Sequence, residues 1–372
     1  MTTAGIVAEF NPFHKGHEYL IAEARSKGAT HIVCCMSGAA VQRGELAIAD
    51  KHARAAAAVR GGADLVVELP APFSCSCAEV FAKYAVRTLL KLGTDVLAFG
   101  SEYDDAAVLK KAAETSLWLP DNELTHRLEA EGMTYPAAIA EAARQLAGKE
   151  TAAVLSSPNS TLAVEYINAL QAKADIMPIK RIGAAHDSSE ESDFSSGMEL
   201  RRRMLSGEEH GAFEPVDPTK AESVIYYELL SAGRERLSKL PELGEPLVNR
   251  IIKLSAQPPA TLNEFLLAVK NKSCTLARLR RSALQLTIGV EGSEDVIPEP
   301  PFIRILAMNE RGTQILRRAQ PDIPVSTSLS TLAASSERAA RIIDTENRAV
   351  KLMQLCSGRF ENEFTRKITV MK

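Results

Sequence analysis

The chain has 372 residues, of which 45% are hydrophobic and 24% charged, and its formal net charge is −3 at pH 7. This length favours two domains, and the composition is typical of a globular chain that buries a substantial core without disulfides. The net charge gives no global reason to expect nucleic-acid binding, so a nucleic-acid partner would have to meet a local basic patch. No apolar window reaches the length of a membrane span, the first residues lack a leader pattern, and the six cysteines lack zinc-site spacing. We therefore expect a cytoplasmic protein with reduced thiols and no membrane partner.

The first hundred residues alternate apolar runs with helical patterns. We expect strands at residues 4–9, 30–36, 63–69 and 95–99, and helices at residues 16–26, 50–60 and 78–92. Apolar strands separated by amphipathic helices predict an α/β, Rossmann-like fold with a parallel sheet covered on both faces. Ligands of such sheets bind beyond the carboxyl ends of the strands, here the loops after Glu9, Met36, Leu69 and Phe99.

The rest of the chain becomes progressively more helical. We expect helices at residues 122–148, 160–173 and 196–205, with short strands at 152–154 and 177–181. From about Pro218 the pattern changes to helices separated by prolines. We therefore predict a nucleotide-binding domain at residues 1–216 and a mainly helical domain at residues 217–372.

The first strand is followed by the run Glu9-Phe-Asn-Pro-Phe-His-Lys-Gly-His17 and then by a helix. Pro12 fixes the turn, and Gly16 lets the backbone approach a ligand closely. His14 and His17 lie three residues apart across this turn, where the helix start adds free N–H groups suited to a phosphate chain. The simpler interpretation is a pair of surface histidines at a helix start. We predict phosphate binding, with His14 and His17 as the catalytic residues, because fixed donors stabilise a pentacovalent phosphorus.

This His-x-Gly-His turn after a first strand resembles the first signature of the HIGH-type nucleotidylyltransferase superfamily. The superfamily has a second, hydroxyl-rich signature at the start of a late helix. The run Phe194-Ser-Ser-Gly-Met-Glu-Leu-Arg201 stands at the corresponding place. The resemblance implies that Ser196 is the N-cap of that helix and that Arg201 faces the phosphates. Met198 stands where a second hydroxyl is usual, which weakens the phosphate contact there.

A narrower resemblance covers nearly the whole chain. The matching runs are Met36-Ser-Gly with Val41 to Glu45, Gly62 to Pro70, Leu97 to Glu102, Pro158 to Tyr166, Lys180 to Gly183 with His186-Asp187, and Phe302 to Leu306. Together they resemble the bacterial tRNA(Met) cytidine acetate ligase family. This resemblance implies an enzyme that uses ATP to adenylate acetate and passes the acetyl group to N4 of the wobble cytidine in elongator tRNA(Met).

The same resemblance implies the residues that bind ATP. The turn and helix start would be formed by Val7, Ala8, Glu9, Phe10, Asn11, Pro12, Phe13, His14, Lys15, Gly16, His17, Glu18, Tyr19 and Leu20. Gly100 would lie against the adenosine, and Asn159 and Arg181 would make further nucleotide contacts. Gln42, Arg43 and Lys51 could serve phosphate or acetate, and the sequence does not choose between these roles. Mg²⁺ is expected to arrive with ATP, because no carboxylate cluster calls for a metal held by the protein.

Two basic clusters are candidates for tRNA binding: Arg201 to Arg203, and Lys270 to Arg281. A charge run is more often a solvated helix face. The first alternative function is a nucleotidylyltransferase acting on a small phosphorylated metabolite, which would leave the basic clusters without a purpose. The second is a non-catalytic tRNA-binding protein, which would not need both histidines.

Overall fold

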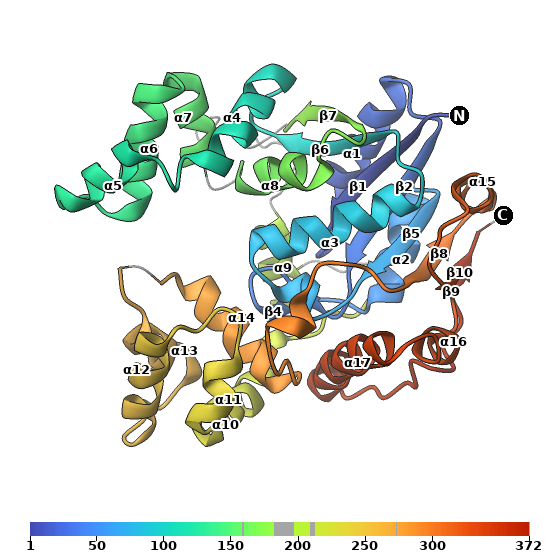
Figure 1. The fold of residues 1–372 in the computed structure, drawn as a ribbon. Coiled ribbons are helices and arrows are strands. Elements are labelled where there is room, and N and C mark those ends of the chain that lie inside the picture. The colour runs from blue at the N-terminus through green and yellow to red at the C-terminus, as the bar shows by residue number, and fades with distance from the viewer. Residues whose placement is uncertain (158–159, 182–196, 209–212, 273, 372) are drawn as a thin grey trace.

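A computed structural model describes residues 1–157, 160–181, 197–208, 213–272 and 274–371 of the chain (Figure 1). At its centre lies a mostly parallel sheet with strand order β10-β8-β5-β2-β1-β6-β7, and β9 pairs with β8. The strands are β1 (Thr3–Ala8), β2 (His31–Ser37), β5 (Leu65–Leu69), β6 (Val96–Ser101), β7 (Asp175–Lys180), β8 (Ile303–Met308), β9 (Val325–Ser326) and β10 (Thr369–Val370). The α/β class with a parallel sheet is therefore confirmed.

Strand β2 shows why these apolar runs form central strands. Its side chains alternate between the two faces, as the two-residue period of a strand requires. Val33 and Cys35 join the core under α3 (Ala78–Lys91) and α8 (Thr161–Leu170). Ile32, Cys34 and Met36 join the opposite core, under α1 (Lys15–Ser26) and α2 (Lys51–Arg60). Both faces of the sheet are thus covered, as the absence of polar alternation predicts.

The region after β6 differs from the expectation in two places. The predicted strand at residues 152–154 lies inside α7 (Lys149–Ser156), where Val154 packs against the sheet-side core. Three apolar residues do not distinguish a strand from a buried helix turn, so that prediction was wrong. The predicted helix at 122–148 is divided into α5 (Glu123–Ala130) and α6 (Tyr135–Leu146), with Gly132 at φ +97° between them. With α4 (Ala106–Trp118), these helices lie beside the β6–β7 edge of the sheet (Figure 1).

A helical segment follows the sheet-forming half of the chain. It contains α10 (Glu222–Ser231), α11 (Arg234–Lys239), α12 (Glu245–Ser255), α13 (Leu262–Val269) and α14 (Leu276–Thr287). In Figure 1 it lies below the sheet, at the end where α9 (Gly197–Leu205) and β4 (Glu45–Leu46) are drawn. We refer to residues 218–296 as the helical segment.

The C-terminal part of the chain returns to the sheet, which the predicted boundaries 1–216 and 217–372 do not anticipate. Strand β8 pairs antiparallel with β5, and β10 pairs with β8. The long helix α17 (Glu337–Ser357) contributes Ile342 to the core on the sheet and Met353 to the core of the helical segment. Pairing between strands more than 200 residues apart has no local signal, because β8 alone is only a short apolar run.

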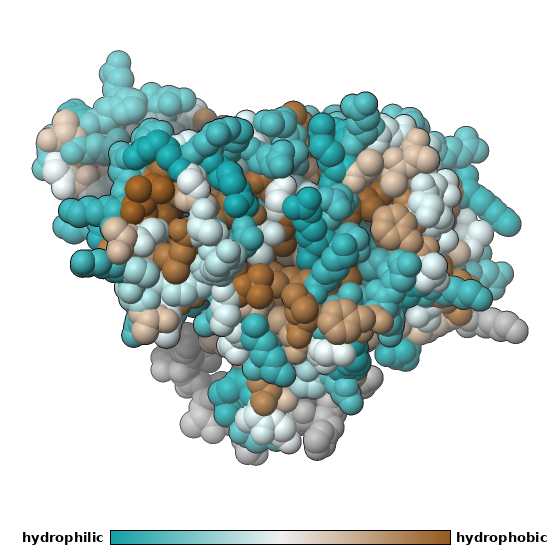
Figure 2. Space-filling model, turned by 90° about the horizontal axis from the view of Figure 1, so that it is seen from below, coloured by the Kyte–Doolittle hydropathy of each residue, from teal (hydrophilic) through white to brown (hydrophobic). Residues whose placement is uncertain are grey.

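The face of the molecule seen from below carries hydrophilic residues over much of its area, with apolar residues gathered in separate patches (Figure 2). Within the described ranges, no helix has both the length and the hydrophobicity that crossing a bilayer requires.

Candidate active site

The turn between β1 and α1 holds the two histidines in a reciprocal cap. His14 is the N-cap residue of α1, and its Nδ1 accepts the backbone N–H of Gly16 at 3.0 Å. The Nδ1 of His17 accepts the backbone N–H of His14 at 3.2 Å. A ring nitrogen that accepts a hydrogen bond carries no proton, so in both rings the proton lies on Nε2. Both side chains are therefore fixed as Nε2–H donors.

The environment of the two rings keeps them neutral. Burial lowers the pKa of His14, and Arg181 and Arg201 lower it further. Burial also lowers the pKa of His17, well below its usual value, with His14 and Arg181 as further causes. The rings stack with centroids 3.8 Å apart, and Phe10 meets His17 edge-on at 4.9 Å. A neutral imidazole donates from Nε2 without taking up a proton, which suits stabilisation of charge on a phosphate better than proton abstraction.

Helix α9 brings an arginine to the same turn. The NH1 group of Arg201 donates to the carbonyl oxygen of Asn11 at 2.7 Å. A Cβ atom added at Gly197, the first residue of α9, would lie 3.7 Å from Nε2 of His14. The start of this helix therefore lies next to the histidine donors, as the second signature implies. Ser196, its predicted N-cap, and Asn159 lie outside the described residues.

The end of β6 brings a second arginine to the site. Gly100 is the fifth residue of β6, and the backbone N–H of Arg181 donates to the Ser101 carbonyl at 3.0 Å. A Cβ atom at Gly100 would lie 3.3 Å from Nε of Arg181. Because Arg181 also lowers the pKa values of both histidines, it lies within electrostatic reach of them. The structure thus brings His14, His17, Arg181 and Arg201 together near the carboxyl ends of β1, β6 and β7.

The other residues that the resemblance assigns to ATP binding lie in the same turn. Val7 and Ala8 end β1, and Phe10 has φ +45° in the turn that follows. The side-chain oxygen of Asn11 accepts the backbone N–H of Ile48 at 2.7 Å, which ties the turn to the loop before α2. Pro12 and Phe13 complete the turn, and Lys15, Gly16, Glu18, Tyr19 and Leu20 form the first turns of α1.

Glu9 occupies the position between β1 and the histidine turn. Its Oε1 accepts the backbone N–H of Gln42 at 2.8 Å, at the tip of the hairpin formed by β3 (Ala40–Val41) and β4. Burial raises the pKa of Glu9, and the Gln42 N–H, Arg201, Arg54 and Arg43 oppose that rise.

Arg54 of α2 is a supporting residue that the sequence did not single out. It is fully buried and donates to the carbonyl oxygens of Glu9 at 2.6 Å and Ser37 at 3.0 Å, and also to that of Gly38. Burial lowers the pKa of Arg54 to about 10, which still leaves it charged at neutral pH. It therefore fixes the carboxyl ends of β1 and β2. An arginine inside an alanine-rich helix was the only local signal.

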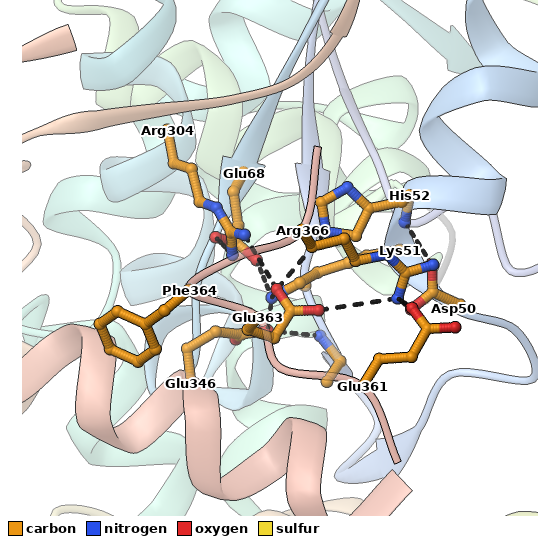
Figure 3. A network of polar contacts seen from close by, with 12 residues as sticks. Asp50, Lys51, His52, Glu68, Arg304, Glu346, Glu361, Glu363, Phe364 and Arg366 are labelled. Carbon is orange, nitrogen blue, oxygen red and sulfur yellow. Dashed lines mark hydrogen bonds and ion pairs between the residues drawn. The ribbon is translucent and has the colours of Figure 1, made fainter. Parts of the chain in front are cut away.

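Lys51 lies in a buried ionic network (Figure 3) and not among the residues around His14 and His17. Its Nζ contacts Glu68 at 2.6 Å, Glu346 at 2.9 Å and Glu363 at 3.4 Å. Burial alone would lower the pKa of Lys51, but the three carboxylates outweigh it and raise the pKa. With 1% of its surface exposed, Lys51 cannot bind phosphate or acetate, so that expectation was wrong. Gln42 presents its backbone N–H to Glu9, and Arg43 is exposed at the hairpin tip.

The same buried network holds two loops near the site in place. Glu346 of α17 accepts the backbone N–H groups of Ala39 at 2.8 Å and Ala71 at 2.7 Å. These residues lie in the loops that follow β2 and β5. Arg304 of β8 links Glu68 and Glu363 at 3.2 and 2.9 Å. The C-terminal part of the chain thereby fixes loops at the carboxyl ends of the central strands.

The arginines of the predicted basic clusters have protein partners. Arg280 pairs with Glu45 at 2.8 Å, Arg281 binds Glu242, and Nε of Arg278 donates to the Glu242 carbonyl at 2.6 Å. Arg202 pairs with Glu199 at 2.7 Å. Lys270 and Lys272 are exposed. The arginines of α14 therefore serve mainly to join helices and the hairpin, which leaves the two lysines as the better candidates for phosphate contacts.

The chain is similar to known proteins over nearly its whole length. The profile of the HIGH Nucleotidyl Transferase family matches residues 1–367. The tRNA(Met) cytidine acetate ligase of Acetivibrio thermocellus is 30% identical over the whole of both chains, and that of Syntrophotalea carbinolica is 32% identical over 91% of this chain and 87% of its own.

Two crystal structures of Thermotoga maritima TmcAL, each 27% identical, cover both chains completely. The apo form has a TM-score of 0.89, and the form bound with alpha-thio ATP has a TM-score of 0.86. The similarity therefore extends through the helical segment and the returning strands as well as the nucleotide-binding turn.

Proposed function

The chain belongs to the HIGH nucleotidyl transferase family and to the tRNA(Met) cytidine acetate ligases, and from this membership we propose that it acetylates N4 of the wobble cytidine of elongator tRNA(Met), using ATP and acetate. The observation that supports this most directly is the pair of Nε2–H donors at His14 and His17, flanked by Arg181 and Arg201. A relative with the same fold binds an ATP analogue.

In the first half-reaction, a carboxylate oxygen of acetate attacks the α-phosphorus of ATP. The bond to pyrophosphate breaks, and acetyl-adenylate forms. The imidazole N–H groups of His14 and His17 donate to phosphate oxygens as their charge redistributes, and the two arginines attract the departing pyrophosphate. Mg²⁺ would enter with the triphosphate, held by phosphate oxygens and water.

The remaining ATP contacts would come from residues at the carboxyl ends of the strands. Gly100 gives a bare backbone surface against which adenosine can lie, and Arg181 would cover its other side or the ribose-phosphate. Asn159 and Ser196 are assigned to ATP only through the family resemblance. In the second half-reaction, the cytidine amine attacks the acetyl carbon and AMP leaves.

We assign tRNA binding to the helical segment, because it lies at the end of the sheet where the nucleotide would bind (Figure 1). Each of the two alternative functions has a specific observation against it. A metabolite nucleotidylyltransferase would not require relatives that match through the helical segment. A non-catalytic tRNA-binding protein would not require two capped histidines.

The decisive experiment combines the protein with ATP, acetate, Mg²⁺ and unmodified elongator tRNA(Met), followed by nucleoside mass spectrometry. We expect N4-acetylcytidine only when all components are present. If pyrophosphate is released in an acetate-dependent manner but no acetylated nucleoside forms, the acceptor is wrong and the adenylation chemistry stands. If neither is seen, the proposed function is wrong.

A further inference from the structure

Transfer of the acetyl group to a cytidine amine requires that the nitrogen lose a proton. We propose that Glu9 is the general base that takes this proton, so that it acts in the second half-reaction and not in the formation of acetyl-adenylate. The inference rests on the proposed function and assigns a role within it.

The side chain of Glu9 is held in place through one of its two carboxylate oxygens. Its backbone carbonyl accepts from Arg54 at 2.6 Å, and its Oε1 accepts from the Gln42 backbone at 2.8 Å. Among the described residues, no group donates to its Oε2. A carboxylate with one oxygen fixed and the other available has the orientation that a general base needs.

Glu9 lies between the histidine turn and the hairpin that contacts the helical segment. It follows β1 directly and precedes the turn that carries His14 and His17, so it lies beside the phosphate donors. Its side chain reaches the hairpin β3–β4. Gly44 of that hairpin packs on the α14 backbone at Arg281, where a Cβ atom would collide. Glu9 therefore lies between the nucleotide turn and the connection to the helical segment, the side from which we expect the tRNA.

Four other carboxylates near the site pair with cations. Glu68, Glu346 and Glu363 bind Lys51 in the buried network. Glu45 pairs with Arg280 at 2.8 Å. In the part of the chain that the structure describes, Glu9 forms no direct ion pair, whereas each of these four carboxylates does.

The charges that face Glu9 are consistent with this role. Arg43 of the hairpin, Arg54 of α2 and Arg201 of α9 favour its ionised form, and Tyr166 of α8 is a further titratable group near it. Burial raises the pKa of Glu9, which makes the carboxylate a stronger base than an exposed one. The Gln42 N–H and the three arginines oppose this rise.

In the transfer step, each bond that forms is matched by one that breaks. The N4 lone pair forms a bond to the acetyl carbon, and the carbon–oxygen bond to the adenylate breaks. AMP leaves with that electron pair. The proton of the attacking nitrogen moves to Oε2 of Glu9 and is later released to water.

The test separates the two half-reactions with the Glu9→Gln variant. Glutamine keeps an oxygen that accepts the Gln42 N–H but cannot take a proton. We expect single-turnover acetyl transfer to tRNA to fall by about 10²–10⁴-fold, and by at least about tenfold more than acetate-dependent ATP–pyrophosphate exchange falls. Glu165→Gln is the matched control, because burial raises the pKa of Glu165 too but its neighbours are Glu79 and Lys83 on α3. This control should transfer acetyl groups normally.

The pH dependence provides a second measurement that needs no variant. Wild-type transfer should fall on acidification as Glu9 takes up a proton, and the Glu9→Gln variant should lack this acidic limb. Unchanged transfer in the variant, or an equal loss in both half-reactions, would overturn the role of Glu9. If Glu9→Gln unfolds, a wild-type transfer rate that is independent of pH on the acidic side would overturn it instead. Wild-type protein that forms no N4-acetylcytidine would refute the proposed function itself.

Discussion

The Nδ1 atom of His17 accepts the backbone N–H of His14 at 3.2 Å, and Nδ1 of His14 accepts the backbone N–H of Gly16 at 3.0 Å, so the helix start holds both rings in place. The helix start fixes the tautomer of both rings with the proton on Nε2, and the rings stack with their centroids 3.8 Å apart. The sequence motif is therefore a helix-capping device that also presents two donors.

Replacing His17 with alanine should abolish most of the adenylation activity while leaving the fold intact. Loss of one preorganised donor reduces turnover by about 10²–10³-fold, and loss of the cap costs about 0.5–2 kcal/mol of stability. His14→Ala should behave in the same way. The measurement is acetate-dependent ATP–pyrophosphate exchange, together with circular dichroism.

A capping variant elsewhere separates these two effects. Thr261 and Glu264 form a capping box at the start of α13, with both hydrogen bonds at 3.2 Å. Thr261→Ala should lower stability to a similar degree without changing the exchange rate. Near-wild-type exchange in His17→Ala, with unchanged dichroism, would refute the role of the histidines.

The pH dependence of adenylation should reflect neutral histidines. Folding lowers the pKa values of His14 and His17, chiefly through burial. Their contribution to stability is therefore fully present above the unfolded pKa of about 6.5 and is lost as the pH falls through the lowered value. We expect the exchange rate to stay constant between about pH 6.5 and 8 and to fall only in more acidic solution. A rate that falls steadily as the pH rises through this window would mean that a charged histidine is required.

The sequence predicted those parts of the molecule that local patterns determine. The apolar runs at β1, β2, β5 and β6 form strands, and the glycines after α2 close that helix at Gly61. The histidine turn was also recognisable, because its motif is contiguous.

The sequence did not predict contacts between distant residues. Lys51 and Glu346 are 295 residues apart, and nothing near Lys51 distinguishes a buried cation from a ligand-binding one. The return of β8 to the sheet and the pairing of Arg280 with Glu45 were missed for the same reason. A charge run in the sequence carries no information about its partners in space.

Removing Lys51 should destabilise the protein strongly. Lys51→Met would leave Glu68, Glu346 and Glu363 close together with Arg304 as the main remaining cation. Breaking a buried ion pair in this way typically costs about 3–5 kcal/mol. The free energy of unfolding in urea measures it. Arg234→Ala, which removes an exposed pair with Glu245 at 3.1 Å, is the control and should change stability by less than about 1 kcal/mol. Equal, small effects of both variants would show that the network is dispensable.

Gly100→Ala should weaken ATP binding without destabilising the fold. The added methyl would lie 3.3 Å from Nε of Arg181, a flexible side chain that can move away. It would also occupy the surface that we assign to adenosine, so we expect the Kd for ATP to rise on the order of tenfold, equivalent to about 1.4 kcal/mol. Gly233→Ala is the control, because no atom lies within 4 Å of the added methyl there. Isothermal titration with ATP measures both. Unchanged affinity in Gly100→Ala would place the adenosine elsewhere.

The salt dependence of tRNA binding should separate the lysines of the helical segment from its arginines. Lys272 is exposed, whereas Arg281 is buried and bound to Glu242. Each phosphate contact contributes about one unit to the slope of log K against log salt concentration, so Lys272→Ala should reduce that slope by about 1. Arg281→Ala should leave the slope unchanged and lower the free energy of unfolding, because it leaves Glu242 without its partner. Filter binding of elongator tRNA(Met) at several salt concentrations gives the slopes. If Arg281→Ala reduces the slope and Lys272→Ala does not, the ion pair with Glu242 opens on binding and the arginines of α14 meet the tRNA after all.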